Sequence, residues 1–128
     1  MPGETDLNKL LSTMSPVLND GAYVFAIVNT EIPPGLSPVV TVREKEGLTL
    51  VLEKEQADAA GLSYDYVAAW ITLEVHSALE AVGLTAAISN VLTDAGISCN
   101  VVAGYTHDHL FVPKGKAQQA MSALGTLG

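Results

Sequence analysis

The chain has 128 residues, which corresponds to one ordinary domain or to two very small ones that share a core. Hydrophobic residues make up 48% and charged residues 16%, a balance that excludes intrinsic disorder and leaves enough side chains for a core. Six Lys and Arg residues stand against 14 Asp and Glu residues, so the formal net charge is −8. Such an acidic chain repels phosphates, and we expect no nucleic-acid partner.

Cysteine content and apolar runs limit the compartment and the kinds of site. The single cysteine, Cys99, excludes an internal disulfide and a four-sulfur zinc site. Met1–Asn8 is polar and lacks the features of a signal peptide. No apolar run approaches the roughly 20 residues of a membrane span. We therefore expect a soluble, cytoplasmic protein with no membrane partner.

The chain begins with the pattern of a short helix followed by a strand. Apolar residues in Leu7–Met14 recur at i, i+3, i+4 and i+7, which predicts an amphipathic helix with Thr5 or Asp6 as its N-cap. Ala22–Val28 is entirely apolar and predicts a strand that is buried on both faces. The prolines of Asn29–Pro38 indicate a loop.

A hairpin and a second helix follow this loop. Val39–Arg43 and Leu48–Leu52 are predicted strands, joined by the charged turn Glu44–Gly47. Glu53–Ala60 predicts a short helix, with Gly61 at its C′ position.

The second half has a similar set of elements. Tyr66–Val75 alternates between two faces, which predicts a strand, and His76–Val82 is a connector. Leu84–Ala95 carries apolar residues on one helix face and ends at Gly96. The remaining predicted elements are the strands Ile97–Tyr105 and His109–Val112, the tight turn Thr106–Asp108 between them, and a last helix with Ala117, Ala120, Met121 and Leu124 on one face.

Helices that alternate with pairs of strands predict an α+β fold of two ferredoxin-like halves, whose antiparallel sheets carry helices on one face. We place the N-terminal half at residues 1–63 and the C-terminal half at residues 64–128. An ungapped shift of 77 residues pairs Leu7 with Leu84 and Val24 with Val101, which favours two similar halves.

The run Leu84–Val112 carries a more specific pattern. A Leu-x-Asp-Ala-Gly-Ile string, residues 92–97, joins its helix to its strand, and the hairpin Gly104–Val112 follows. This pattern resembles an ACT domain over residues 66–125, and Tyr23–Val28 and Leu48–Leu62 resemble the N-terminal half of two-ACT proteins. The hairpin is similar to one subgroup, which contains short bacterial proteins with two ACT halves and the cytosolic arginine sensors of eukaryotes.

The resemblance implies a non-catalytic module without a cofactor that binds an amino acid and regulates a partner protein. ACT modules usually pair their sheets side by side, so it also implies a homodimer. In the resembled sensors the residue that matches Asp108 contacts the ligand. The chain departs from the family at the Asp-x-Pro-Gly-Leu loop, which is Ala81-Val-Gly-Leu84 here and lacks both the Asp and the Pro.

The start of the Leu84–Ala95 helix is the candidate carboxylate site. Its unpaired N–H groups and positive dipole end suit an anion without any basic side chain. Gly83 permits close approach of a ligand, Leu84 opens the helix and Thr85 adds a hydroxyl group. The alternative is that Gly83 only makes the turn and Thr85 only caps the helix.

The hairpin is the candidate ammonium site. Asp108, placed in the turn between two strands, can accept charge-assisted hydrogen bonds from an ammonium or guanidinium group. The backbone groups of Gly104, Tyr105 and Thr106 could pair with a ligand that lies along the strand. An Asp that stabilises its own turn, in a plain hairpin, explains these residues equally well.

Other chemistries have weaker signals. His107 and His109 lie on the same side of an extended chain and flank Asp108, but a third metal ligand has no recognisable spacing, and His76 is the only other histidine. Cys99 is interpreted as a buried apolar residue, and no nucleophile, phosphate or HExxH motif is present. We therefore expect an amino-acid sensor without catalytic residues or metal. The alternatives are a ligand-free interaction module and, less favoured, a small metal-binding protein that uses His107, Asp108 and His109.

Overall fold

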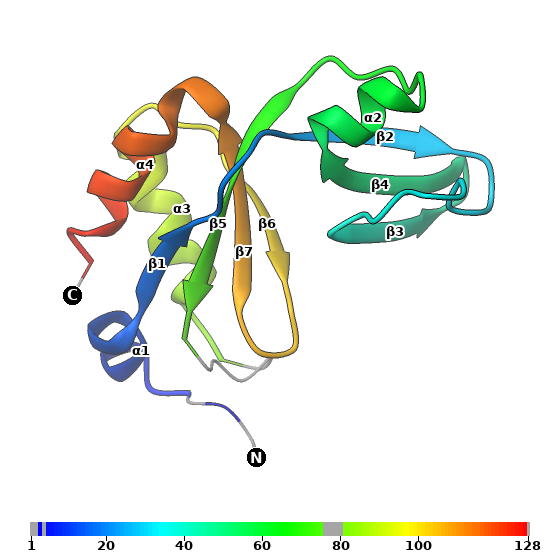
Figure 1. Ribbon diagram of the computed structural model, residues 1–128. Coiled ribbons are helices and arrows are strands. Elements are labelled where there is room, and N and C mark those ends of the chain that lie inside the picture. The colour runs from blue at the N-terminus through cyan, green and yellow to red at the C-terminus, as the bar shows by residue number, and fades with distance from the viewer. Residues whose placement is uncertain (1–2, 4, 76–80, 128) are drawn as a thin grey trace. The chain divides into compact units, whose positions relative to one another are not determined.

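The computed structural model describes residues 3, 5–75 and 81–127 (Figure 1). These residues form two compact units. Unit 1 consists of Met1–Asp20 and Ala69–Gly128, and unit 2 consists of Gly21–Ala68. The strand β5 (Val67–Glu74) belongs to both, because its first two residues lie in unit 2 and the others in unit 1.

Unit 2 is a sheet with one helix over one face. Its strands follow the order β3-β4-β2-β5 and pair antiparallel. The elements are β2 (Tyr23–Val28), β3 (Val40–Glu44), β4 (Gly47–Glu53) and α2 (Lys54–Ala59). The predicted loop, hairpin and short helix of this region are confirmed, with shifts of one or two residues at their ends.

The core of unit 2 lies between the sheet and α2, and it occupies only one face of β2. Val24 and Ala26 are buried in it together with Leu50, Leu52 and Ala57. Ile27, on the opposite face, is 53% exposed. The prediction that β2 is buried on both faces is therefore confirmed only at its start, where Tyr23 on the face of Ile27 is 5% exposed, and is wrong at Ile27. Side chains alternate along a strand, and α2 covers the face of Val24 and Ala26 alone.

Both predicted glycine caps are confirmed. Gly61 follows α2 with φ of +70°, and Gly96 follows α3 with φ of +73°. At the end of α2, Leu62 N–H donates to the Ala57 carbonyl (2.9 Å) and Gly61 N–H donates to the Asp58 carbonyl (3.2 Å). This bond pair requires a left-handed residue after the helix, which glycine adopts without a Cβ penalty.

Unit 1 is a second sheet with helices on one face. Its strands follow the order β1-β5-β7-β6, and in Figure 1 α3 and α4 lie on the same side of them. The elements are α1 (Leu7–Thr13), β1 (Ser15–Leu18), α3 (Leu84–Asp94), β6 (Asn100–Ala103), β7 (Asp108–Pro113), a 3-10 turn (Lys114–Lys116) and α4 (Ala117–Leu124). The predicted connector His76–Val82 falls for the most part outside the described residues.

The apolar faces predicted for the second half form the core of unit 1. Ile71 and Leu73 of β5, Ile88 and Leu92 of α3, and Leu124 of α4 are fully buried in one cluster. The helix at the start of the chain adds Leu10 to this cluster. Its predicted N-cap is confirmed, because the Asp6 carboxylate accepts from Asn8 N–H at 2.9 Å and from Lys9 N–H at 3.3 Å.

The sequence did not predict β1. Ser15–Leu18 pairs antiparallel with β5, from Ser15↔Glu74 to Leu18↔Ile71. Pro16 lies within this strand, which stands at the edge of unit 1, where the missing N–H of a proline can be tolerated. Four residues with a proline carry no strand pattern of their own, so pairing with a distant strand decides their structure.

Both units have the same strand order. The sheet of unit 2 has the order β3-β4-β2-β5, and the sheet of unit 1 has the order β6-β7-β5-β1. The two orders are equivalent when β5, β6, β7 and β1 take the places of β2, β3, β4 and β5. The prediction of two similar α+β halves is confirmed. The shift of 77 residues is the wrong correspondence, because it pairs β2 with β6, whereas β2 occupies the place of β5. Unit 1 takes its fourth strand from the start of the chain, and the division at residue 64 stays a prediction.

Candidate functional site

The first half of the predicted ligand site is the start of α3. Gly83 is its N-cap, with φ of +100°, and Leu84 is 3% exposed while Thr85 is exposed. A Cβ on Gly83 would lie 3.1 Å from Leu7 Cδ2. The structure therefore explains a glycine at position 83 without a ligand, because both its backbone conformation and the neighbouring α1 disfavour a side chain there.

The hairpin tip, which is the second half of the predicted site, lies at the same end of unit 1 as the start of α3 (Figure 1). Gly104 N–H donates to the His107 carbonyl at 2.9 Å and closes a turn around Tyr105 and Thr106. Tyr105 is 77% exposed, and Thr106 is exposed. The turn thus covers Gly104–His107 and not Thr106–Asp108 as predicted.

Asp108 lies in β7, opposite Ala103, and not in the turn. β7 begins one residue before the predicted His109, because backbone pairing does not require apolar side chains. The predicted strand Ile97–Tyr105 is shorter than expected, since β6 covers only Asn100–Ala103. Asp108 is half-buried, and this burial raises the pKa of its carboxyl group while His109 and His107 oppose the shift. A half-buried carboxylate can accept charge-assisted hydrogen bonds from an ammonium group.

A polar network holds His109 on the opposite side of the sheet from α3. Trp70 Nε1 donates to His109 Nδ1 at 3.1 Å, and Thr72 Oγ1 lies 3.3 Å from the same nitrogen. Asn19 Nδ2 donates to Thr72 Oγ1 at 3.0 Å. His109 therefore serves as an acceptor within the fold. Among residues 5–75 and 81–127 no group of three or more His, Cys, Asp and Glu could hold a metal, and His76 lies outside the described residues.

The fold is expected to lose stability in mild acid through His109. Burial and the charge of His107 lower the pKa of His109 below its usual value, and Asp108 opposes them. The unfolded chain binds this proton near pH 6.5, so below that pH it binds more protons than the folded chain. The stabilisation is complete above about pH 6.5 and is lost as the pH falls toward the folded pKa.

The measurement is the urea midpoint, followed by the fluorescence of Trp70, at pH 7.5 and pH 5.5. We expect a lower midpoint at pH 5.5 for the native chain and a smaller difference for His109→Gln. His107→Gln is the matched histidine control, and it should keep most of the pH dependence because burial, the larger cause of the lowered His109 pKa, remains. An equal pH dependence in His109→Gln would contradict the role of His109.

Cys99 does not have the properties of a catalytic thiol. It is half-buried and packs against the core of unit 1. Burial raises the pKa of its thiol to about 11. The thiol is protonated at neutral pH, whereas a nucleophilic cysteine needs a lowered pKa.

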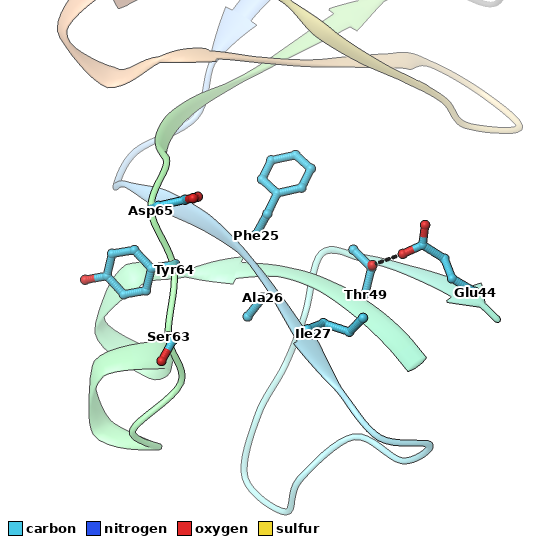
Figure 2. Close-up of a pocket in the computed structure, with 8 residues that line it drawn as sticks. All are labelled: Phe25, Ala26, Ile27, Glu44, Thr49, Ser63, Tyr64 and Asp65. Carbon is cyan, nitrogen blue, oxygen red and sulfur yellow. Dashed lines mark hydrogen bonds between the residues drawn. The ribbon is translucent and has the colours of Figure 1, made fainter. Parts of the chain in front are cut away.

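Unit 2 contains a cavity that the sequence did not reveal. Figure 2 shows the residues that line it, which are Phe25, Ala26, Ile27, Glu44, Thr49, Ser63, Tyr64 and Asp65. Its volume is about 640 Å³, and it opens to solvent. The alternation of Phe25 and Ile27 with Val24 and Ala26 was visible in the sequence, but only the structure shows that Ile27 is exposed and Phe25 half-buried beside this cavity.

Two family comparisons cover nearly the whole chain. A family model described as "ACT domain" matches residues 2–69, and a second ACT domain model matches residues 66–126. The chain belongs to the ACT domain family. No curated protein matches it. The further assignment to the arginine-sensor subgroup is not part of these matches.

Solved structures of similar fold include one close relative. A Vibrio cholerae protein of unknown function, described as a possible transport protein, is 55% identical, with 94% of each chain covered and a TM-score of 0.86. An Agrobacterium tumefaciens protein is 20% identical over 90% of this chain and 89% of its own, with a TM-score of 0.69. The ligand-free regulatory subunit of aspartate kinase from Thermus thermophilus is 9% identical, covers 88% of this chain and 95% of its own, and has a TM-score of 0.66. The last two share the fold.

None of the helices in the described parts of this ACT protein has the length and apolar character needed to cross a membrane.

Proposed function

We propose that this ACT protein is a non-catalytic regulatory protein that binds an amino acid at one end of unit 1. The observation that carries the proposal is the placement of the α3 N-terminus, opened by Gly83 at φ of +100°, at the same end as the β6–β7 hairpin. A helix N-terminus supplies N–H donors and a positive dipole end for the ligand carboxylate.

The hairpin supplies the acceptor in this proposal. The half-buried carboxylate of Asp108 receives the ligand ammonium, and the backbone of Gly104, Tyr105 and Thr106 borders the ligand. Thr85 adds a hydroxyl group beside the ligand carboxylate. The resemblance of the hairpin to the arginine sensors, and the fold shared with a regulatory subunit of aspartate kinase, support an amino acid as the ligand.

The regulatory effect follows from linkage. A ligand that binds one arrangement of the protein more tightly than another shifts the population toward it, and a partner protein reads the difference. We further propose that the protein is a cytoplasmic homodimer. The regulated partner is a separate protein that contacts the liganded homodimer.

The proposal predicts that one amino acid raises the melting temperature. A ligand at 100 times its Kd adds about 2.7 kcal/mol to the free energy of unfolding, and for a domain of this size that is a shift of several degrees. The measurement is the melting temperature with each of the twenty amino acids at millimolar concentration. Asp108→Asn should abolish the shift, because it removes the charge that pairs with the ammonium group.

Asp94→Asn is the matched control, since Asp94 is exposed at the far end of α3 and should leave the shift intact. If none of the twenty amino acids shifts the melt, the amino-acid sensor is wrong and a ligand-free interaction module replaces it. Stoichiometric metal in protein purified without a histidine tag, lost in His107→Ala, would instead favour the metal-binding alternative.

A further inference from the structure

The cavity of unit 2 lies on the sheet face opposite α2 and has an apolar floor. Ile27 of β2 and Thr49 of β4 are directly paired, and Phe25 pairs with Val51 on the same face. Ile27 is 53% exposed there, and the Phe25 ring contacts the Tyr66 ring with centroids 6.1 Å apart. The Phe25 ring and the Ile27 side chain of this floor can contact the apolar body of a small ligand.

A divergence of two strands opens the cavity. The ladder between β2 and β5 ends at Val24↔Val67, whereas β2 itself continues to Val28. The segment Ser63–Asp65, which leads into β5, lines the cavity from its other side. The Tyr64 hydroxyl is directed away, because it donates to Asp58 Oδ1 at 2.6 Å. Asp65 therefore supplies the charged group of this wall, and Ser63 adds a hydroxyl.

Carboxylates stand at two ends of the floor. In the view of Figure 2, Asp65 lies beside Phe25, and Glu44 lies beyond Thr49. The Thr49 hydroxyl donates to Glu44 Oε2, which orients that carboxylate from β3 toward the cavity. The eight residues that line the cavity include no Lys and no Arg. The lining is thus apolar in the middle, acidic at both ends and without a basic side chain.

We propose that this cavity binds a small organic cation, namely an ammonium or guanidinium group on an apolar body. The carboxylates of Glu44 and Asp65 attract the charge, the Phe25 ring accepts the cation over its face, and Ile27 contacts the methylene groups. The net charge of −8 also favours the approach of cations. An amino acid is disfavoured, because no basic side chain of this lining offsets the charge of its carboxylate beside Glu44 and Asp65. The site is separate from the one proposed in unit 1.

The test uses agmatine, which carries a guanidinium and an amine but no carboxylate, as the probe for the full chain. We expect backbone amide resonances of Phe25, Ile27, Thr49 and Asp65 to shift in a saturable manner, while Gly83 and the β6–β7 hairpin do not respond. Binding should weaken with added salt. Glu44→Gln and Asp65→Asn should each raise the Kd about fivefold, as expected for partly exposed charge pairs.

Glu31→Gln is the matched control. It removes one negative charge from an exposed loop position of unit 2 outside the cavity and should leave the Kd unchanged. Equal weakening by Glu31→Gln and Glu44→Gln would overturn the proposal, because it would reduce the effect to net charge. Shifts at Gly83 and the hairpin, or none at all, would overturn it as well.

Asp108→Asn distinguishes this proposal from the amino-acid site. This variant should bind agmatine with the native Kd even though it no longer responds to the amino acid. Glu44 and Asp65 are exposed, so their variants are expected to fold, and the native dispersion of their amide spectra checks that they do.

Discussion

Gly47→Ala is expected to lower the free energy of unfolding by about 3 kcal/mol, the upper end of the usual range for single substitutions. Gly47 begins β4 with φ of +153°, a conformation that L side chains rarely adopt. A Cβ there would also lie well inside contact distance of the Val28 carbonyl oxygen, and 3.1 Å from Ile27 Cγ1. The backbone of two paired strands must separate to admit it, so hydrogen bonds are lost in addition to the strain.

The comparison is with Gly35→Ala. Gly35 also has a positive φ, of +85°, but nothing lies within 4 Å of its Cβ position, so we expect a loss of about 1 kcal/mol from the backbone alone. Urea unfolding followed by circular dichroism measures both values. Similar losses in the two variants would mean that the sheet yields easily at Gly47, and the close approach to Val28 would then be unimportant. The local displacement at Gly47 should also weaken agmatine binding, because Glu44 pairs with Gly47 in the β3–β4 ladder.

Leu92→Ala is the second large effect, with an expected loss of about 3 to 4 kcal/mol. Leu92 is 0% exposed on the inner face of α3 and packs in the core of unit 1. Its removal leaves a cavity that buried neighbours from β5, β7 and α4 can only partly fill. The helix that carries the proposed carboxylate site would also be less firmly held.

Val91→Ala is the matched control on the same helix. Val91 is only partly buried against the core, so we expect a loss of about 1 kcal/mol. The fluorescence of Trp70, the one tryptophan of the chain, reports the unfolding of unit 1 in both variants. If Leu92→Ala costs no more than Val91→Ala, the core around α3 collapses readily and is not closely packed.

The candidate site could be predicted in part. Gly83 and the Gly104–Val112 hairpin were recognised from the sequence, and the structure places the helix start and the hairpin tip at the same end of unit 1. The position of Asp108 was wrong by one element, because backbone pairing extended β7 to it. Whether these residues bind a ligand stays a prediction. The unit 2 cavity was missed, because the apolar run of β2 predicts burial on both faces and does not reveal that Ile27 stays exposed.

The sequence by itself determined the elements whose signals are local. These elements are the N-cap of α1, predicted as Thr5 or Asp6 and found at Asp6, the ends of α2 and α3 at Gly61 and Gly96, and the inner face of β5. Each depends on residues close by in the sequence. Only the tertiary structure decided the rest: that Ser15–Leu18 becomes a strand beside β5, and that Phe25 and Ile27 face a cavity. These outcomes depend on which distant segment pairs with a strand edge or covers a sheet face, and no local pattern of residues carries that information.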